Sequence, residues 1–450
     1  MSFQQGLSGL DGASNALDTI GNNIANSSTV GFKGATAQFS DVYAAAMVGS
    51  SSNQVGIGST TAAVAQTFTQ GNFTTTGNPL DVAINGNGFY RLSSQTGASS
   101  GEISYTRNGQ FSVNSNGYIV NSAGLFLTGI LPDASGNIPS SGPAGAIQLN
   151  TSLINPKSTT ASQIGLNLDS TEKVVTVTPF DPTNPTTYND STTQTVYDSL
   201  GNPHSLQMYF VKTDTSNQWL MYTELDGDAT TLNSTANGAA DPALALGQAA
   251  GSITVDGVAA TGGIALSFNS SGALTTTMPM TQTSTPALWP PAGYSLAATT
   301  GATNLLFSLD LTGTTQFGAK FGVNAIAQDG FAPGNLTGIK IGTDGTVSGT
   351  YSNGQLRAMG RLVLSTFQNN NGLQNVGGNL WQETASSGQP VTGTPGQGNL
   401  GVLQSGSVED SNVDLTSELV NMIVQQRAYQ ANAQTIKTQD TILQTLVNLQ

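Results

Sequence analysis

Two stretches of helical apolar periodicity, one at each end of the chain, constrain the fold more than any other feature. In the first 30 residues the apolar side chains fall on one helical stripe: Phe3, Leu7, Leu10, Leu17, Ile20 and Ile24. The last segment carries a second stripe of the same kind: Leu415, Leu419, Met422, Tyr429, Ile436, Leu443 and Val447. Because an apolar helix face is stable only when it is covered, both chain ends require partners.

Both predicted helices have recognisable ends. Asp414, four residues before Glu418, is a start signal for the C-terminal helix. The N-terminal helix runs into a polar turn whose marked residues are Asn22, Asn23, Asn26, Gly31 and Phe32. Asn and Gly adopt turn conformations readily, and Asn side chains bond loose backbone groups, so this stretch predicts a helix stop.

The interior of the chain alternates between apolar and polar residues with a period of two. Residues 81–92 and 104–129 are typical of short strands separated by Asn-Gly turns. One pattern of apolar pairs around a turn glycine recurs at 111–119, 266–274 and 339–347. It fits β-hairpins in general and is also compatible with an internal repeat. The interior is therefore predicted to be antiparallel β.

Composition divides this interior into two parts. Residues 71–147 and 313–400 share dense hairpin signals, whereas 148–312 is richer in Thr, Pro and Ala and includes a hairpin within 205–225. We therefore predict an inner β domain built from both flanks and an outer β domain inserted into it, with an extended linker at 31–70. The predicted fold class is mainly β with terminal α-helices.

Composition also excludes several function classes. Charged residues make up 8% of the 450-residue chain, against about 25% in ordinary globular proteins, and the formal net charge is −14. The 12 Lys and Arg residues are scattered, which argues against nucleic acid as a partner. The absence of cysteine excludes disulfides and thiolate sites. No apolar run approaches the ~18 residues of a membrane span, and no cleavable signal peptide is recognisable.

A search for catalytic chemistry yields no site. The single histidine, His204, has no accompanying set of catalytic groups and is interpreted as a loop imidazole. Nucleotide-binding, zinc-protease, EF-hand and nucleophile-elbow motifs are absent. Trp219, Trp289 and Trp381 are interpreted as packing residues rather than a sugar-binding face. The sequence predicts no catalytic, cofactor-binding or metal-ligating residues, no cofactor and no enzyme activity.

The N-terminal helix is poorly suited to exposure in water. Its only charges are Asp11 and Asp18, and its remaining off-stripe positions are mostly Ser, Asn, Gln and Gly. Uncharged polar faces beside an apolar stripe suit burial against many neighbours, which favours packing in a polymer of identical chains. The alternative is an intramolecular helical hairpin that caps a β domain.

Both chain ends and the β regions next to them resemble the axial proteins of the bacterial flagellum, the rod and hook family. The resemblance rests on the opening MSFQQGLSGL, the NNIAN signature followed by GFK, and the C-terminal segment 411–449. Within this family the chain is most similar to hook proteins, because 195–213 and 328–355 resemble the start of their outer domain and its return. Residues 226–312 match only in general character.

The resemblance implies that residues 1–30 and 405–450 pair as a coiled coil lining a central channel. It implies a structural subunit of the flagellar hook, a curved helical tube that acts in motility as a flexible universal joint between rod and filament. Implied partners are further copies of the chain, the distal rod protein, hook-filament junction proteins, the hook cap and the type III export apparatus. The implied location is the extracellular hook.

Two alternatives stay open at this point. Within the same family the chain would be a distal rod or hook-associated protein. From a different class, a secreted β-rich adhesin or polysaccharide-acting enzyme would share the acidic, cysteine-free interior, but it would not require apolar stripes at both chain ends.

Overall fold

The computed structural model divides the chain into two compact units. Unit 1 comprises residues 1–151, 337–350 and 354–450, and unit 2 comprises 152–336 and 351–353. Unit 2 is thus inserted into unit 1, and the structure is mainly β with a helix at each end, which confirms the predicted fold class. The described residues are 2–42, 58–97, 101–133, 136–227, 254–255, 258–259, 263–276, 301–303, 305 and 307–447.

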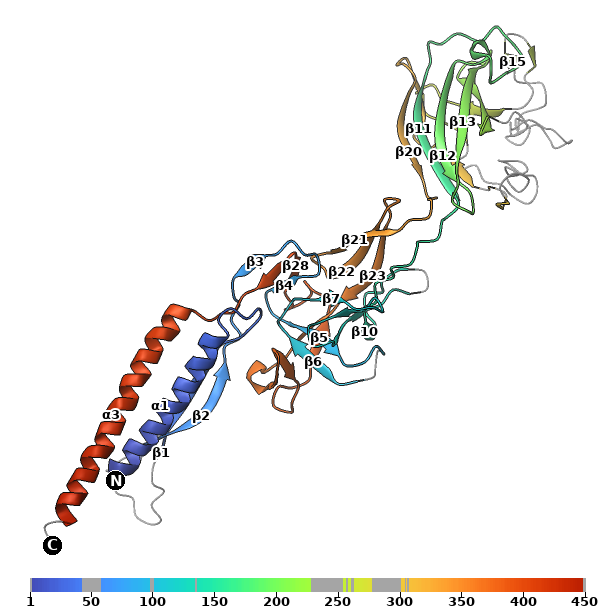
Figure 1. Ribbon diagram of the computed structural model, residues 1–450. Helices are drawn as coiled ribbons and strands as arrows, with labels where there is room; N and C mark the ends of the chain where they lie inside the picture. Colours follow the sequence, from blue (N-terminus) through green and yellow to red (C-terminus); the bar gives the residue numbers. More distant parts are fainter. Residues whose placement is uncertain are drawn as a thin grey trace. The chain divides into compact units, whose positions relative to one another are not determined.

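The two chain ends form long helices that pack against each other. α1 spans Ser2–Ala25 and α3 spans Leu415–Val447, and they run side by side in opposite directions (Figure 1). Oδ1 of Asp414 accepts hydrogen bonds from the backbone N–H groups of Thr416 and Ser417, so this residue caps α3 as predicted.

Residues 31–70, predicted as an extended linker, contain an antiparallel strand pair. β1 (Ala35–Val42) pairs with β2 (Gly58–Gln66), and both strands lie along α1 (Figure 1). Asn15 in α1 donates from Nδ2 to Oγ1 of Thr61 in β2 at 3.0 Å. This segment is therefore a packed part of the helical region and not merely a connection.

The β part of unit 1 is assembled from both sides of the insertion. The strands before it are β3 (Phe73–Thr75), β4 (Val82–Asn85), β5 (Phe89–Ser93), β6 (Ile103–Thr106), β7 (Ser112–Val113), β8 (Ile119–Val120), β9 (Phe126–Ile130) and β10 (Ala144–Ala146). The elements after it are β21 (Leu336–Ile341), β22 (Thr346–Tyr351), β23 (Leu356–Leu362), β24 (Leu364–Thr366), η3 (Asn370–Gly372), β25 (Gln374–Gly377), β26 (Leu380–Gln382), β27 (Val391–Gly393), β28 (Val402–Ser405) and β29 (Ser407–Glu409).

The strand order mixes these two groups. The main sheet runs β21-β22-β23-β9-β5-β6-β26-β25, and β28 and β29 return to pair with β4 and β3. An aromatic cluster fills the core beneath this sheet, with edge-to-face contacts among Phe89, Tyr105, Phe367 and Trp381. The chain therefore delivers its C-terminal helix next to the segment that follows α1.

Unit 2 is a β-sandwich with an apolar core. Its elements are β11 (Ala161–Asp169), η1 (Pro185–Thr187), β12 (Asp190–Tyr197), β13 (Pro203–Lys212), β14 (Gln218–Leu225), β15 (Thr254–Val255), β16 (Val258–Ala259), β17 (Ile264–Ser267), β18 (Ser308–Asp310), β19 (Thr315–Phe317) and β20 (Gly322–Gln328). One sheet runs β12-β13-β14-β17, which contains the predicted hairpin, and the other is centred on β11. Side chains such as Ile164, Phe210 and Trp219 are fully buried in the core formed by both sheets.

The structure differs from the sequence prediction in two details of this unit. The sequence pattern predicts 313–400 as part of the inner domain, but β19 and β20 pair with β11, so the chain leaves unit 2 near residue 336. In addition, β11 pairs in parallel with β18 and β19, whereas the interior was predicted to be antiparallel. Both differences arise from long-range pairings that local periodicity does not reveal. Trp289 lies outside the described residues.

Candidate assembly site

The contact between α1 and α3 is close because α1 presents small residues to it. A Cβ atom built at Gly6 would lie 3.0 Å from Cγ1 of Ile436, and one built at Gly9 would lie 2.7 Å from Nδ2 of Asn432. Ala13 and Ala16 of α1 are also buried. Glycine and alanine at these positions let the two helix backbones approach more closely than larger side chains would allow.

The predicted apolar stripe of α3 is only partly covered in the single chain. Met422 and Ile436 are half-buried, but Leu419 is 45% exposed and Leu443 is 55% exposed. Among the described side chains of α3, the other exposed large apolar ones are Leu415, Val420, Ile423, Val424, Tyr429 and Ile442. Val447 ends the helix, and its side chain lies outside the described residues. Pairing with α1 therefore leaves a long apolar surface on α3.

The predicted apolar stripe of α1 is likewise buried in one part and exposed in another. Ile20 is buried and Leu10, Leu17 and Ile24 are half-buried, whereas Phe3 and Leu7 are 47% and 45% exposed. The half-buried positions of α3 include polar side chains, among them Gln425 and Asn432. The predicted set of apolar residues thus does not form one closed seam between the two helices.

The polar turn after α1 connects three elements. Asn23, 2% exposed, accepts at Oδ1 from the backbone N–H of Ala35 at 2.9 Å and donates from Nδ2 to the Ala35 carbonyl at 2.8 Å. The same Nδ2 donates to Oε1 of Glu418 in α3 at 3.2 Å. Asn26 closes the helix end, since its Nδ2 donates to Oδ1 of Asn22 at 2.9 Å. These amides hold α1, β1 and α3 together.

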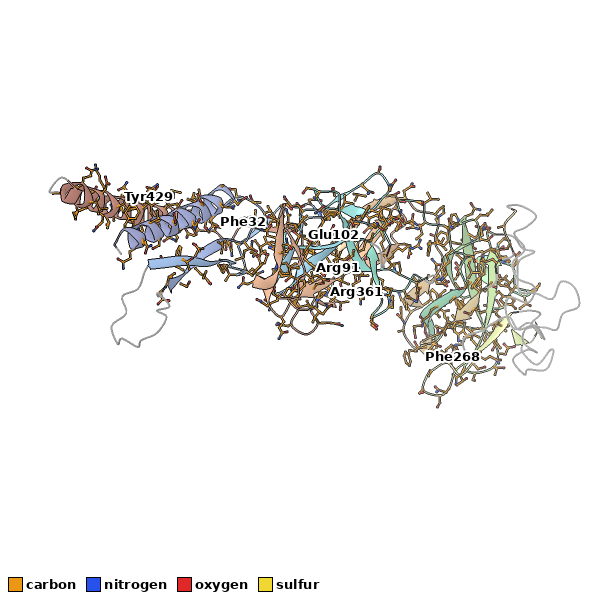
Figure 2. All side chains as sticks on the ribbon, turned by 90° about the horizontal axis from the view of Figure 1, so that it is seen from below. Phe32, Arg91, Glu102, Phe268, Arg361 and Tyr429 are labelled. Atoms are coloured by element: carbon orange, nitrogen blue, oxygen red, sulfur yellow. The ribbon has the colours of Figure 1, made fainter. Side chains whose placement is uncertain are left out.

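Gly31 is the point at which the chain leaves this turn. Its φ of +71° lies in the left-handed region, and an added Cβ would lie 2.7 Å from the backbone nitrogen of Asn108. Its N–H donates to the Glu409 carbonyl at 2.7 Å. Phe32 follows, half-buried, where α1 gives way to the β part of unit 1, and Tyr429 is seen on α3 (Figure 2).

A buried ion cluster lies directly beyond this glycine. Nζ of Lys33 is 2.6 Å from Oε1 of Glu409, Nη1 of Arg107 is 3.3 Å from Oε2, and the side chains of Lys33 and Glu409 are fully buried. Lys33 also donates to the Thr69 carbonyl at 2.7 Å, and the Gly71 N–H donates to Oε1 of Glu409 at 2.9 Å. Burial lowers the pKa of both Lys33 and Arg107, and the Glu409 carboxylate opposes that shift.

This cluster joins segments from both chain ends. Asn412 extends it, because Oδ1 accepts from the Gly34 N–H at 2.8 Å and Nδ2 donates to the Thr67 carbonyl at 2.7 Å. Lys33, Arg107 and Glu409 are not among the site residues predicted from the sequence. A usable signal was present, since Lys33 is the first cation of a chain with few charges and follows Gly31 and Phe32 directly.

The histidine and the tryptophans considered for catalysis or sugar binding make structural contacts within the fold. His204 contacts Oδ2 of Asp226 through Nδ1 at 2.6 Å and Oδ2 of Asp198 through Nε2 at 3.3 Å. Trp219 and Trp381 are buried, in agreement with the packing interpretation. Within the described ranges, no group of three or more His, Asp or Glu side chains is arranged to bind a metal ion. None of the described helices has the length and apolar character that a membrane span requires.

Comparison with known proteins identifies the family to which the chain belongs. The chain is 42% identical over 461 residues to the flagellar hook protein FlgE of Escherichia coli K12, with 100% of both chains covered. The chain belongs to the flagellar hook protein family. It is also 43% identical to the hook protein of Salmonella typhimurium LT2, with full coverage of both chains, and 31% identical to that of Borreliella burgdorferi, covering 100% of this chain and 99% of the relative.

Models of four flagellar domains match successive parts of the chain. Residues 3–33 match the flagella basal body rod protein, 83–175 the FlgE/F/G D1 domain, 167–331 the FlaE D2 domain and 404–449 the C-terminal domain of the rod FlgEFG proteins. The flagellar hook protein family is structural, so the chain is a structural subunit of the hook. The rod, hook-associated and secreted adhesin or enzyme alternatives are not favoured.

Proposed function

We propose that copies of this chain assemble through their terminal helices into a curved helical tube that acts as a flexible universal joint between rod and filament. The observation that carries the proposal is the apolar surface that remains on α3 after it pairs with α1, on which Val420 and Val424 are each 56% exposed. Monomeric proteins rarely expose contiguous apolar surface of this kind, which points to partners of the same chain. Different patches on successive subunits would meet, so growth would not close.

The two units suit different layers of such a tube. The helices with their apolar faces would supply cohesion in an inner layer around a channel. The outer β domain presents Ser, Thr and Gly, whose weak contacts exchange with water at little free-energy cost and would supply compliance during bending. Residues 1–30 and 405–450 would be largely disordered in the free monomer and would gain helical order as neighbouring copies cover their apolar faces.

A position in the hook determines which other proteins the chain would contact. Beyond further copies of itself, the chain would meet the distal rod protein, the hook-filament junction proteins, the hook cap and the type III export apparatus. It would reach the extracellular hook without a cleavable signal peptide. It would carry no catalytic activity and no cofactor.

Electron microscopy of the purified full-length chain tests the proposal. We expect negatively stained tubes with a central channel, together with a gain of helical circular dichroism as the tubes form. A chain that stays monomeric at high concentration, with unchanged helix content, contradicts it.

A further inference from the structure

A polar cleft in unit 1 lies beside α1, and its lining includes Asn23, Lys33 and Ala35 of the junction described above. It has a volume of about 540 Å³ and is lined by the C-terminal part of α1, by β2, by Phe32 and by the segment from η3 to β25. Phe32, one of the residues that line the cleft, is labelled in Figure 2. Binding sites commonly have volumes of roughly 300–1,000 Å³, so the cleft is large enough for a short stretch of chain.

The cleft is lined by side-chain amides that retain hydrogen-bonding capacity. Gln66 uses Oε1 to accept from Nε1 of Trp381 at 2.7 Å, and Asn22 uses Oδ1 to accept from Asn26. Within the described part of the chain, their amide NH₂ groups have no partner. The side-chain amides of Asn370 and Asn371 make no hydrogen bond there either. Each of these groups resembles a backbone peptide group in its donors and acceptors.

The charges and apolar walls of the cleft narrow the choice of ligand. The ammonium of Lys33 is fully buried on Glu409, so it offers no cation to a phosphate or carboxylate, while Asp18 is exposed. Val64, 55% exposed, and the half-buried Leu373 supply apolar contact. An uncharged ligand that combines peptide groups with small apolar side chains fits this surface better than an anion does.

The cleft is also continuous with the outer surface of α1. Two of its lining residues, Asp18 and Asn22, belong to an exposed stripe along one side of that helix: Phe3, Leu7, Asp11, Asn15, Asp18 and Asn22. Phe3 and Leu7 are part of the apolar surface through which we propose that copies assemble. A neighbouring copy that covers this stripe would therefore reach the cleft.

We infer that the cleft binds an extended, uncharged segment of a second copy of this chain, whose backbone peptide groups pair with the amides of Asn22, Gln66, Asn370 and Asn371. The inference rests on the proposed self-assembly. Long stretches rich in Ser, Thr, Gly and Asn make up much of the chain and provide segments of this character.

The double variant Asn370→Asp/Asn371→Asp tests the inference in the full-length chain. It keeps the size of both side chains but replaces NH₂ donors with carboxylates, which repel backbone carbonyls. We expect an unchanged melting temperature of the monomer and a critical concentration for assembly raised at least about tenfold. The matched control Gln397→Glu/Asn399→Asp makes the same change of charge at exposed residues outside the cleft and should assemble like the native chain.

Cross-linking identifies the occupant directly. Because the chain has no cysteine, Asn371→Cys gives a unique thiol for a maleimide-benzophenone label. Irradiation of assembled protein should give intermolecular products at an uncharged segment, and irradiation of monomer should not. Native protein that forms no tubes would overturn the proposed function. Tubes that form equally well from the cleft double variant, or cross-links confined to one chain, would overturn this inference alone.

Discussion

The sandwich of unit 2 and the terminal helices of unit 1 bury their apolar residues to very different extents. In the sandwich, Leu206, Phe210 and Trp219 are completely buried by the two sheets of the same chain. In α3, by contrast, Val420 and Ile423 are more than half exposed although the helix already has a partner in α1. The comparison shows that one region completes its core within a single chain and the other does not. The following variants test this contrast, in order of decreasing effect.

The largest effect should come from placing charge on the exposed surface of α3. We expect Leu419→Glu/Ile423→Glu to abolish tube formation, because a buried carboxylate without a partner costs several kcal/mol in every subunit contact. The melting temperature of the monomer should not fall, since both side chains are exposed in the single chain. Sedimentation and negative-stain microscopy measure assembly.

The control for that variant is Gln426→Glu/Gln430→Glu, which adds the same charges at exposed polar positions one turn apart on α3. If both variants assemble equally well, or if the first one destabilises the monomer, then α3 is not an unfinished surface and the contrast with unit 2 fails.

The buried ion cluster should show the next largest effect. Glu409→Gln leaves the two buried cations Lys33 and Arg107 without a carboxylate, which we expect to cost about 3–5 kcal/mol of local stability. In assembled tubes, faster hydrogen exchange at the Gly31 and Gly71 amides, both bonded to Glu409, would report the loss. The added change Lys33→Met should recover part of it.

A surface ion pair in unit 2 provides the matched comparison. Lys157 and Asp329 are 2.8 Å apart but partly exposed, so Lys157→Met should change stability by less than about 1 kcal/mol. Equal effects at the two sites would show that the junction at Glu409 does not hold the helical region to the β part of unit 1.

Gly31→Ala should have a smaller effect than the loss of Glu409. The positive φ and the close approach to Asn108 together should cost about 2 kcal/mol or more. Gly21→Ala, inside α1 where no atom beyond the helix's own nearby backbone lies within 4 Å of the added Cβ, should instead stabilise by about 1 kcal/mol through helix propensity. Denaturant titration of assembled tubes, monitored by helical circular dichroism, measures both, and a neutral Gly31→Ala would contradict the assigned role of the turn.

The smallest effect concerns pH in unit 2. Burial, with Glu172 and Asp169 nearby, raises the pKa of Asp190 to about 6. The contribution of Asp190 to the stability of unit 2 should therefore be largest below about pH 4 and should decline as the pH rises through about 6, by roughly 1 kcal/mol given the partial exposure of this group. Asp190→Asn should remove this decline, as followed by hydrogen exchange of β12 and β13. A profile that keeps the decline would exclude Asp190 as its cause.

Local sequence patterns predicted the parts of this fold that depend on local chemistry. Asp414 caps α3 and the β13–β14 hairpin forms as expected, because capping and hairpin formation involve residues near in sequence. The pairing of β20 with β11 joins residues about 160 positions apart, and the period-two pattern carries no information on such a partner. The boundary near residue 336 was missed for this reason.

The candidate site was predicted less completely than the fold. The turn residues Asn23 and Gly31 were selected because Asn and Gly have distinctive backbone preferences, and the structure places both at the junction. Glu409 was not selected, since its importance comes from Lys33 and Arg107, which lie far away in sequence. The assembly roles of the apolar stripes stay a prediction.

The distance along the chain between Lys33 and Glu409 has a consequence for the timing of folding. The two residues are 376 positions apart. A polypeptide that emerges from a pore with its N-terminus first would present the ammonium long before the carboxylate that neutralises it. The ion cluster at the base of both helices would then form only after the C-terminal segment has emerged. Subunits truncated before Glu409 would lack this cluster and α3, and so could not join their neighbours.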